Sequence, residues 1–260
     1  MYRWIGCLWG RYRAERGPPC LQFVHSSIRQ FVNFMIVKIC GITRLEDAQQ
    51  AVAHGATAIG FVFWPRSPRY VAPERVTDIV AALPVGLTTV GVFVNESVAR
   101  VRAIVAATGV RIVQLHGDEP PAYASAVGYP IFRSVAIDDV IEASAMWPAG
   151  TRLLLDAADR ERRGGTGKQV DWSRAAAIAR QHPVILAGGL TPSNVAEAIG
   201  CVGPYGVDVS SGVESAPGIK DAMKVARFLE NARGAFERRK AGLVSTTDES
   251  LDLRGRAGKP

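Results

Sequence analysis

The sequence predicts a protein of the α/β class that forms a single (β/α)8 TIM barrel, and three observations support this fold. Between residues 36 and 230, eight short apolar runs alternate with alanine-rich stretches of helical pattern. Several runs are nearly continuous in hydrophobicity, as expected of parallel strands that are covered on both faces. The chain of 260 residues is long enough for one such barrel. The main alternative is an open doubly wound sheet, which the absence of a dinucleotide-binding fingerprint disfavours.

The eight expected strands are short apolar runs rich in β-branched residues. In chain order they are IVKIC (36–40), ATAIGFVF (56–63), LTTVGVFV (87–94), RIVQLH (111–116), IFRSVAI (131–137), RLLLD (152–156), PVILAGG (183–189) and YGVDVS (205–210). In a barrel of parallel strands, the C-terminal ends of all these runs open to one face.

Helices are expected between these strands, and several of them carry start signals. The signals are Thr43 before its helix, Pro73 in a first turn, Glu96 at the start of a stretch that runs to Gly109, and Thr191 as an N-cap followed by Pro192 at the first helical position. DWSRAAAIARQH and IKDAMKVARFLENARG supply the later two helices, and weaker helical patterns lie at 119–128 and 138–147.

We expect the barrel domain to occupy residues 35–232. Residues 1–34 are rich in arginine and aromatic residues without a clear period, and we expect them to be disordered or the result of a start assigned upstream of Met35. A transit peptide is the alternative for this extension. Residues 233–260 are polar and low in apolar content, which is typical of a disordered tail.

The net charge of +7 is concentrated in the two ends of the chain. Residues 1–35 carry five arginines against one glutamate, and residues 236–260 carry six basic against four acidic groups, which leaves about +1 for the body. A nearly neutral body argues against a groove that binds nucleic acid. We therefore expect a small-molecule partner rather than a nucleic acid.

The four cysteines and the apolar runs bound the class of protein further. The cysteines, at positions 7, 20, 40 and 201, have no paired spacing, so neither a zinc site nor a disulfide framework is indicated. No apolar run reaches the roughly 18 residues that a membrane span requires. We therefore expect a cytoplasmic protein that binds no metal and is not attached to a membrane. Its oligomeric state is expected to be a monomer or a homodimer.

Two loops rich in small residues predict a phosphate site. Phosphate often binds a TIM barrel in the loops after the seventh and eighth strands. Gly188 and Gly189 follow the seventh strand, where backbone amides without a neighbouring Cβ can approach an anion. Ser210, Ser211 and Gly212 follow the eighth strand and can supply hydroxyl groups and further amides. Although each glycine could simply serve a tight turn, the two loops together predict a phosphorylated small-molecule substrate.

A thiol and a carboxylate end two of the expected strands. Cys40 ends the first strand and could be a buried hydrophobe or a base, while Asp156 follows the sixth strand and could be an acid, a helix cap or a partner of Lys168. Partial burial is expected to raise the pKa of Asp156. Lys38 faces the same side as Cys40, where it either favours a thiolate or pairs with Asp208. Either way, the pair predicts acid and base chemistry without a metal or a cofactor.

Two arginines follow the second strand in WPRSPRY (64–70). An arginine can hold a planar carboxylate through two parallel hydrogen bonds, which lysine cannot do. Arg66 and Arg69 could each be an ordinary surface charge. The position at the rim of the barrel favours Arg69 as the residue that binds a carboxylate.

The ordered motifs VKICGIT, GFVFWPRSPRY, VGVFVN, VQLHGDE, LLLDA, GGTGK, DW, LAGGLTPSNV and GVDVSSGVE with PGIKD resemble those of the phosphoribosylanthranilate isomerase family of tryptophan biosynthesis. The resemblance covers about residues 35–232. It implies an isomerase, without a cofactor, that converts N-(5-phosphoribosyl)anthranilate to 1-(2-carboxyphenylamino)-1-deoxyribulose 5-phosphate by an Amadori rearrangement.

The resemblance also implies a role for each candidate residue. Asp156 would be the general acid that opens the sugar ring, and Cys40 the general base at C2, with a pKa expected to be lowered modestly. Arg69 would hold the anthranilate carboxylate. The two small-residue loops would hold the phosphate, and His116 and Asp208 would contact the sugar or the aminophenyl group.

Two other functions are weighed against this one. A related sugar isomerase of the histidine pathway would be expected to place carboxylates at both reactive strand ends, whereas here one of them is a thiol. The second alternative is a noncatalytic function, either as a phosphate-binding barrel or as a nucleic-acid binder recruited through the arginine-rich N-terminus. The nearly neutral charge of the body disfavours this hypothesis.

Overall fold

The computed structural model describes residues 35–156 and 170–252, with side chains described up to residue 242. Residues 1–34 and 253–260 lie outside the described residues, so the expectations for the N-terminal extension and the end of the tail are not addressed by the structure. The GGTGK loop, including Lys168, also lies outside them.

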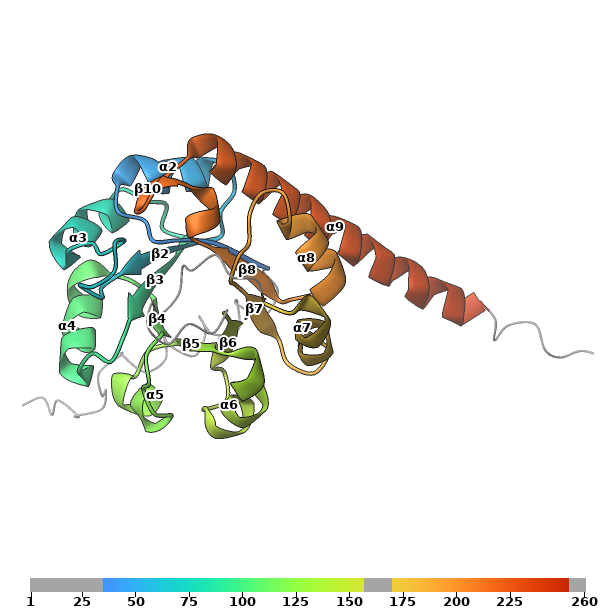
Figure 1. Cartoon of the computed structure of the whole chain (residues 1–260), viewed down its shortest axis with the longest axis horizontal. Coiled ribbons are helices and arrows are strands. Elements are labelled where there is room, and N and C mark those ends of the chain that lie inside the picture. The colour runs from blue at the N-terminus through green and yellow to red at the C-terminus, as the bar shows by residue number, and fades with distance from the viewer. Residues whose placement is uncertain (1–34, 157–169, 253–260) are drawn as a thin grey trace, which may run out of the picture. The chain divides into compact units, whose positions relative to one another are not determined.

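Eight parallel strands form a closed barrel, which confirms the predicted fold class (Figure 1). Each strand pairs with its neighbours in chain order, and the last pairs in parallel with the first, which places Lys38 opposite Asp208. The strands are β1 (Ile36–Cys40), β2 (Ala58–Val62), β3 (Thr88–Phe93), β4 (Ile112–Leu115), β5 (Ile131–Val135), β6 (Arg152–Leu155), β7 (Val184–Leu186) and β8 (Gly206–Val209).

Helices follow the strands around the outside of the barrel (Figure 1). They are α2 (Leu45–Ala53), α3 (Pro73–Ala81), α4 (Val98–Thr108), α5 (Ala122–Val127), α6 (Val140–Met146), α7 (Trp172–Ala179), α8 (Val195–Val202) and α9 (Ala222–Asp252). Two short 3-10 helices, η2 (Ile137–Asp139) and η3 (Ser211–Val213), and the strands β9 (Glu214–Ala216) and β10 (Ile219–Lys220) complete the described elements. The antiparallel β9–β10 pair was not predicted from the sequence.

Some helix starts agree with the prediction and two differ. Pro73 begins α3 as expected, and Gly109, with φ of 71°, ends α4. Thr43 does not cap α2, because its hydroxyl donates to the carbonyl of Gly218 at 2.6 Å instead.

The expected start of α8 was three residues too early. The helix begins at Val195, after Asn194. The Asn194 side chain accepts from the amide of Thr191 at 2.8 Å and donates to the carbonyl of Gly189 at 3.0 Å. These bonds hold residues 191–194 as a turn, so Thr191 and Pro192 lie ahead of the helix rather than in it.

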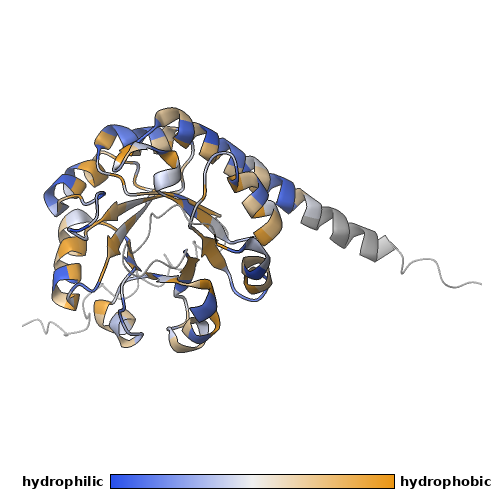
Figure 2. Ribbon diagram, in the orientation of Figure 1, coloured by the Kyte–Doolittle hydropathy of each residue, from blue (hydrophilic) through white to orange (hydrophobic). Residues whose placement is uncertain are grey.

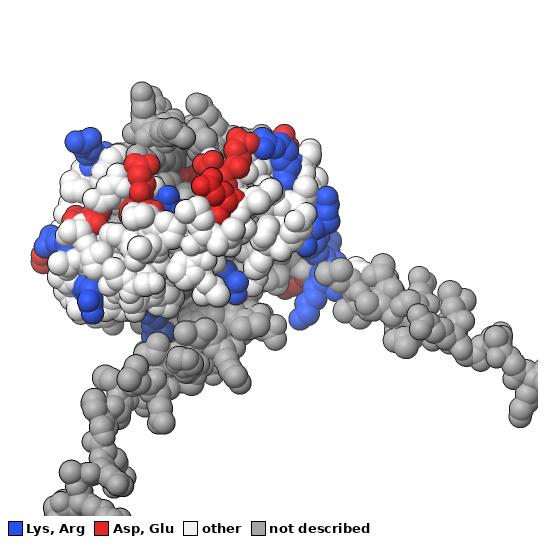
Figure 3. Space-filling model, turned by 90° about the horizontal axis from the view of Figure 1, so that it is seen from below, with Lys and Arg blue, Asp and Glu red and all other residues white. Residues whose placement is uncertain are grey.

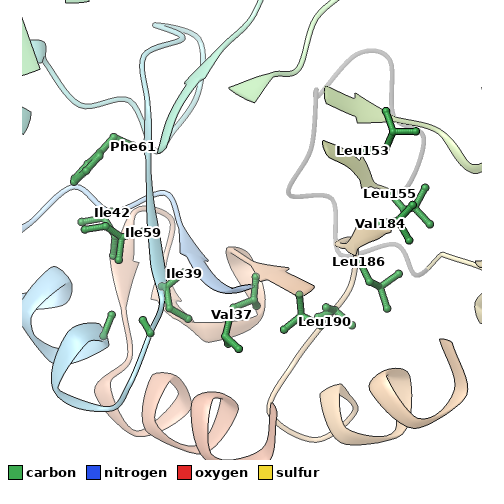
Figure 4. Packing of buried hydrophobic residues seen from close by; sticks show 14 of the residues in the cluster. Val37, Ile39, Ile42, Ile59, Phe61, Leu153, Leu155, Val184, Leu186 and Leu190 are labelled. Atoms are coloured by element: carbon green, nitrogen blue, oxygen red, sulfur yellow. The ribbon is translucent and has the colours of Figure 1, made fainter. Parts of the chain in front are cut away.

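The main core lies between the barrel and its helices. Successive residues of a strand face opposite sides, so Val37 and Ile39 of β1 point outward, away from Lys38 and Cys40. Figure 4 shows Val37 of β1 and Leu186 of β7 directed toward the helices that cover them. The helices carry their apolar residues on the side that meets this layer, as the colouring in Figure 2 shows.

A second cluster fills the barrel interior. It consists of Val90, Ile112, Phe132, Leu154, Ile185 and Ala187. Three of these residues, Ile112, Phe132 and Leu154, are each followed two positions later by an inward-facing polar residue nearer the C-terminal end of the strand. These polar residues are Gln114, Ser134 and Asp156. The polar groups of the barrel mouth therefore stand on an apolar floor.

The barrel continues past the predicted boundary at residue 232. Helix α9 runs from Ala222 to Asp252, and both Ala235 and Phe236 are buried in the main core. The prediction of a polar tail from residue 233 missed this, because two apolar residues within a charged stretch are enough to dock one helical turn.

Charges of both signs are scattered over the face shown in Figure 3, among uncharged residues. Among the described helices, none is both long enough and apolar enough to span a membrane.

We predict that Phe236→Ala lowers the free energy of unfolding by about 3–5 kcal/mol, because it leaves a cavity where a side chain only 2% exposed is packed. The neighbouring exposed Glu237→Ala serves as the matched control and should change it by less than about 0.5 kcal/mol. Urea denaturation of the full chain measures both. Equal stabilities of the two variants would show that the barrel ends before residue 236.

Candidate active site

A buried ion pair lies beneath the barrel mouth. Lys38 is fully buried, and its Nζ lies 2.9 Å from Oδ1 of Asp208. Strand register places the two residues opposite each other on β1 and β8. Lys38 also lies beside Cys40, because a Cβ atom at Gly60 would contact both Sγ of Cys40 and Nζ of Lys38. Of the two interpretations of Lys38, pairing with Asp208 is confirmed, and the contact with Cys40 exists beside it.

Gly60 on β2 makes room for this arrangement. A Cβ atom at this position would lie 2.9 Å from Sγ of Cys40 and 2.9 Å from Cε of Lys38. Both distances are shorter than side-chain atoms tolerate. The glycine therefore allows the thiol and the ammonium to lie side by side inside the barrel.

Burial dominates the acidity of Cys40. The residue is 7% exposed and packs with Val62 and Val92, and Trp64 borders the same cluster. This burial raises the pKa of the Cys40 thiol above its ordinary value of 9.0, although Lys38 and Lys220 act in the opposite direction. The expectation of a modestly lowered pKa was therefore wrong, because burial outweighs the effect of the Lys38 ammonium, which the Asp208 carboxylate also offsets in part.

Asp156 lies on the other side of the mouth, next to His116. Nε2 of His116 lies 3.2 Å from Oδ2 of Asp156 and 3.3 Å from Oγ of Ser134. The amide nitrogen of Gln114 lies 3.2 Å from Nδ1 of the same ring. If Gln114 donates to Nδ1, the neutral ring carries its proton on Nε2, facing the carboxylate.

The two halves of the mouth meet at Asp208. The charges of Lys38, Asp156 and His116 all act on the Asp208 carboxyl, whose pKa is raised chiefly by burial. Asp208 in turn acts on Cys40. Cys40 and Asp156 therefore belong to one electrostatic group at the C-terminal end of the barrel.

Arg69 lies over the turn that follows Cys40. A Cβ atom at Gly41 would lie 2.6 Å from Cδ of Arg69 and 3.0 Å from Oγ of Ser210. The backbone of Gly41 has φ of 73°, in the left-handed region that favours glycine. This turn brings the guanidinium and the loop after β8 next to the thiol.

Two charged residues that the sequence analysis did not single out hold Arg69 in place. Nε and Nη2 of Arg69 donate to the two oxygens of Glu214, each at 2.8 Å. Nζ of Lys220 donates to Oε1 of Glu214 at 2.8 Å and to the carbonyl of Ser210 at 3.1 Å. Although burial alone would raise the pKa of Glu214, the two cations hold it below its ordinary value. The only signal in the sequence was two charges flanking a short turn after the last strand.

The loops after β7 and β8 touch each other. A Cβ atom at Gly212 would lie 1.9 Å from the carbonyl oxygen of Leu190, so only glycine fits there. Gly188 and Gly189 both have positive φ, at 76° and 66°. The Ser210 hydroxyl oxygen is buried, and no group in the described part of the chain hydrogen-bonds it. A hydroxyl without a partner, beside two glycine turns, is the arrangement that an anion with several oxygens would satisfy.

Glu119 joins the loops on the opposite side. Its carboxylate accepts from the amide of Asn95 at 2.7 Å, from the amide of Gly117 at 2.9 Å and from Nη1 of Arg133 at 2.8 Å. Gly117 directly follows His116, so this buried ion pair fixes the loop that carries the histidine. Neither Glu119 nor Arg133 was predicted from the sequence as a site residue.

The structure brings the candidate residues to one face of the barrel. Cys40, His116, Asp156 and Asp208 lie at the ends of β1, β4, β6 and β8, and Arg69 and the glycine–serine loops lie on the same rim. Within the described ranges, no group of three or more His, Cys, Asp and Glu side chains is arranged to hold a metal ion.

Comparison with known proteins adds an independent observation. A family model described as N-(5'-phosphoribosyl)anthranilate (PRA) isomerase matches residues 37–231. The N-(5'-phosphoribosyl)anthranilate isomerase of Geobacter metallireducens is 50% identical over 198 residues, which cover 76% of this chain and 98% of the relative.

Solved structures agree with this similarity. The phosphoribosyl anthranilate isomerase of Thermotoga maritima is 39% identical, with a TM-score of 0.72, over 77% of this chain and 100% of that one. A phosphoribosyl anthranilate isomerase in complex with reduced 1-(o-carboxyphenylamino)-1-deoxyribulose 5-phosphate is 38% identical, with a TM-score of 0.69, over the same shares.

We predict that Lys38→Met lowers the free energy of unfolding by about 3–5 kcal/mol, because it leaves the Asp208 carboxyl buried without its cation. The double variant Lys38→Met/Asp208→Leu should recover most of this loss, since an apolar pair of similar volume removes both charges together. Urea denaturation measures all three proteins. A loss below about 1 kcal/mol in the single variant would contradict the view that the pair is tightly coupled.

Proposed function

The chain belongs to the N-(5'-phosphoribosyl)anthranilate isomerase family, and on this premise we propose how its barrel mouth performs the Amadori rearrangement of tryptophan biosynthesis. The substrate is N-(5-phosphoribosyl)anthranilate and the product is 1-(2-carboxyphenylamino)-1-deoxyribulose 5-phosphate. The observation that carries the proposal is that a thiol at the end of β1 and a carboxyl group that follows β6 lie at the same end of one closed parallel barrel.

Binding uses the two anionic ends of the substrate. The phosphate lies between the loops after β7 and β8, where Ser210 supplies a hydroxyl and the glycine turns supply amides. The anthranilate carboxylate binds Arg69. These two anchors place the ribose over the centre of the mouth, between Cys40 and Asp156.

Asp156 opens the ring as the general acid. Its protonated carboxyl donates a proton to the furanose oxygen while the bond between C1 and that oxygen breaks. The nitrogen lone pair of the anthranilate forms a double bond to C1, which gives an iminium ion. Asp156 is left as a carboxylate beside His116, whose Nε2–H can donate to it at 3.2 Å.

Cys40 then acts as the general base. Its thiolate removes the proton from C2, and the electron pair of that C–H bond forms the C1–C2 double bond and neutralises the iminium nitrogen. The resulting enolamine tautomerises to the ketone. Because the thiol is largely protonated in the ligand-free protein, the cationic iminium adds to Lys38 and Lys220 in favouring the thiolate. His116 and Asp208 contact the sugar or the aminophenyl group in this arrangement.

A cytoplasmic location and a monomeric or homodimeric state stay predictions from the sequence.

We predict that Cys40→Ala and Asp156→Asn each lower kcat by about 10²–10⁴-fold, because each removes one proton-transfer group. The measurement is the loss of substrate fluorescence. Exposed residues of the same type provide the controls, Cys201→Ala and Asp78→Asn, which should keep normal turnover. Near-normal turnover of Cys40→Ala or Asp156→Asn would remove that residue from its role. A tryptophan auxotroph that lacks only this step should grow with the wild-type chain and with both controls.

We also predict that kcat/KM of Asp156→Asn rises with pH between about 7 and 9. In this variant the general acid can no longer titrate, so the profile reports the base alone. The pKa of the Cys40 thiol is raised above 9.0 by burial, so the reactive thiolate is the minor form at neutral pH and its fraction grows up to tenfold per pH unit below the pKa. The pH–rate profiles of Asp156→Asn and of Asp156→Asn/Cys201→Ala measure this. A profile of Asp156→Asn that is flat or falls over this range would contradict a thiolate base.

A further inference from the structure

Three charged side chains around the β9–β10 pair carry a net positive charge. Arg69, Lys220 and Glu214 have side chains that are 12%, 1% and 6% exposed, and they form two ion pairs that share the one carboxylate. We call these three residues the 69–214–220 cluster. Two cations against one anion leave a surplus positive charge in a poorly hydrated place. Such a surplus is stabilised by one further anion.

The geometry selects where that anion binds. A guanidinium has five N–H donors in a fixed plane, and one carboxylate takes up two of them. Glu214 occupies the edge formed by Nε and Nη2. The remaining edge, formed by Nη1 and the second hydrogen of Nη2, presents two parallel donors of the spacing that a second carboxylate accepts.

The cluster is also tied to the rest of the mouth. Lys220 donates its backbone amide to Asp47 of α2 at 3.1 Å and its ammonium to the carbonyl of Ser210 at 3.1 Å. Glu214 begins β9, which pairs with β10 around Lys220. The plane of the Arg69 guanidinium is therefore fixed relative to the phosphate loop and to the turn after Cys40.

We propose that Glu214 is a positioning residue that determines substrate specificity: with Lys220, it orients Arg69 so that the site selects N-aryl aminoaldoses with a carboxylate ortho to the nitrogen. This inference rests on the proposed function and adds to it the residue that makes Arg69 selective. The anion that balances the cluster is the aryl carboxylate. The substrate phosphate binds elsewhere, between the loops after β7 and β8.

The test compares two substrates that differ by one carboxylate. These are N-(5-phosphoribosyl)anthranilate and N-(5-phosphoribosyl)aniline, each made by condensing the arylamine with ribose 5-phosphate. The wild type should prefer the first by roughly 100-fold or more in kcat/KM, because the aniline compound leaves the charged edge of Arg69 unpaired. Glu214→Gln should raise KM for the anthranilate compound about tenfold or more while kcat changes by less than about threefold. Its kcat/KM on the aniline compound should stay within about twofold.

A second variant separates orientation from charge. Glu214→Gln/Lys220→Met has the same surplus of one positive charge as the wild type but lacks the fork that orients Arg69. The double variant also removes Lys220, which the single variant leaves buried without its carboxylate. The double variant therefore allows the test even if Glu214→Gln fails to fold. We expect the double variant to lose the preference for the carboxylated substrate as well. Glu230→Gln, on an exposed position of α9, is the matched control and should keep it.

Three results would overturn the proposal. The first is a double variant with wild-type KM and selectivity, which would show that net charge alone recognises the carboxylate. The second is a lower KM in Glu214→Gln, which would show that Glu214 withholds Arg69 from the substrate. The third is an equal loss on both substrates, which would assign Glu214 a general structural role. A wild-type chain without activity on either substrate would instead refute the proposed function.

Discussion

The ion pair between Lys38 and Asp208 is the constraint on which the barrel mouth depends. Both groups are buried, so each charge is stabilised by the other, and their register joins the first strand to the last where the barrel closes. The pair is neutral as a unit. The ion pair therefore contributes little net charge near Cys40, and burial has the largest effect on the pKa of the Cys40 thiol. In the proposed mechanism, the iminium that forms during the reaction supplies much of the positive charge that activates the thiol.

Charge is divided unequally around this neutral centre. The side formed by the loops after β2 and β8 carries the surplus cation of the 69–214–220 cluster, while the side formed by β4 and β6 carries Asp156 and His116. A substrate with two anionic ends and a ribose that becomes cationic can satisfy both sides only in one orientation. In the proposed mechanism, this orientation sets which face of the sugar meets Asp156 and which meets Cys40. The buried Glu119 keeps the histidine side rigid by holding two loops through backbone amides.

Much of the fold and the place of the site could be predicted from the sequence, and the reasons are physical. Continuous apolar runs identify parallel strands, and the end of such a strand can only open at the barrel mouth, so Cys40, Asp156 and Asp208 could be placed without coordinates. Glu214 and Lys220 could not, because Arg69 meets Glu214 across 145 positions of the chain. The raised pKa of Cys40 also escaped prediction, since it depends on burial that no local pattern reports. The docking of Phe236 in the core was missed for the same reason.

The glycine at position 60 limits what chemistry this barrel can host. Because it provides the room that Cys40 and Lys38 share, any larger residue at position 60 would press on both side chains. Attempts to redirect the scaffold toward other sugars are therefore easier at the outer rim than at this depth. At this depth a larger side chain would displace Cys40 or Lys38, so changes of specificity are better made in the loops of the rim.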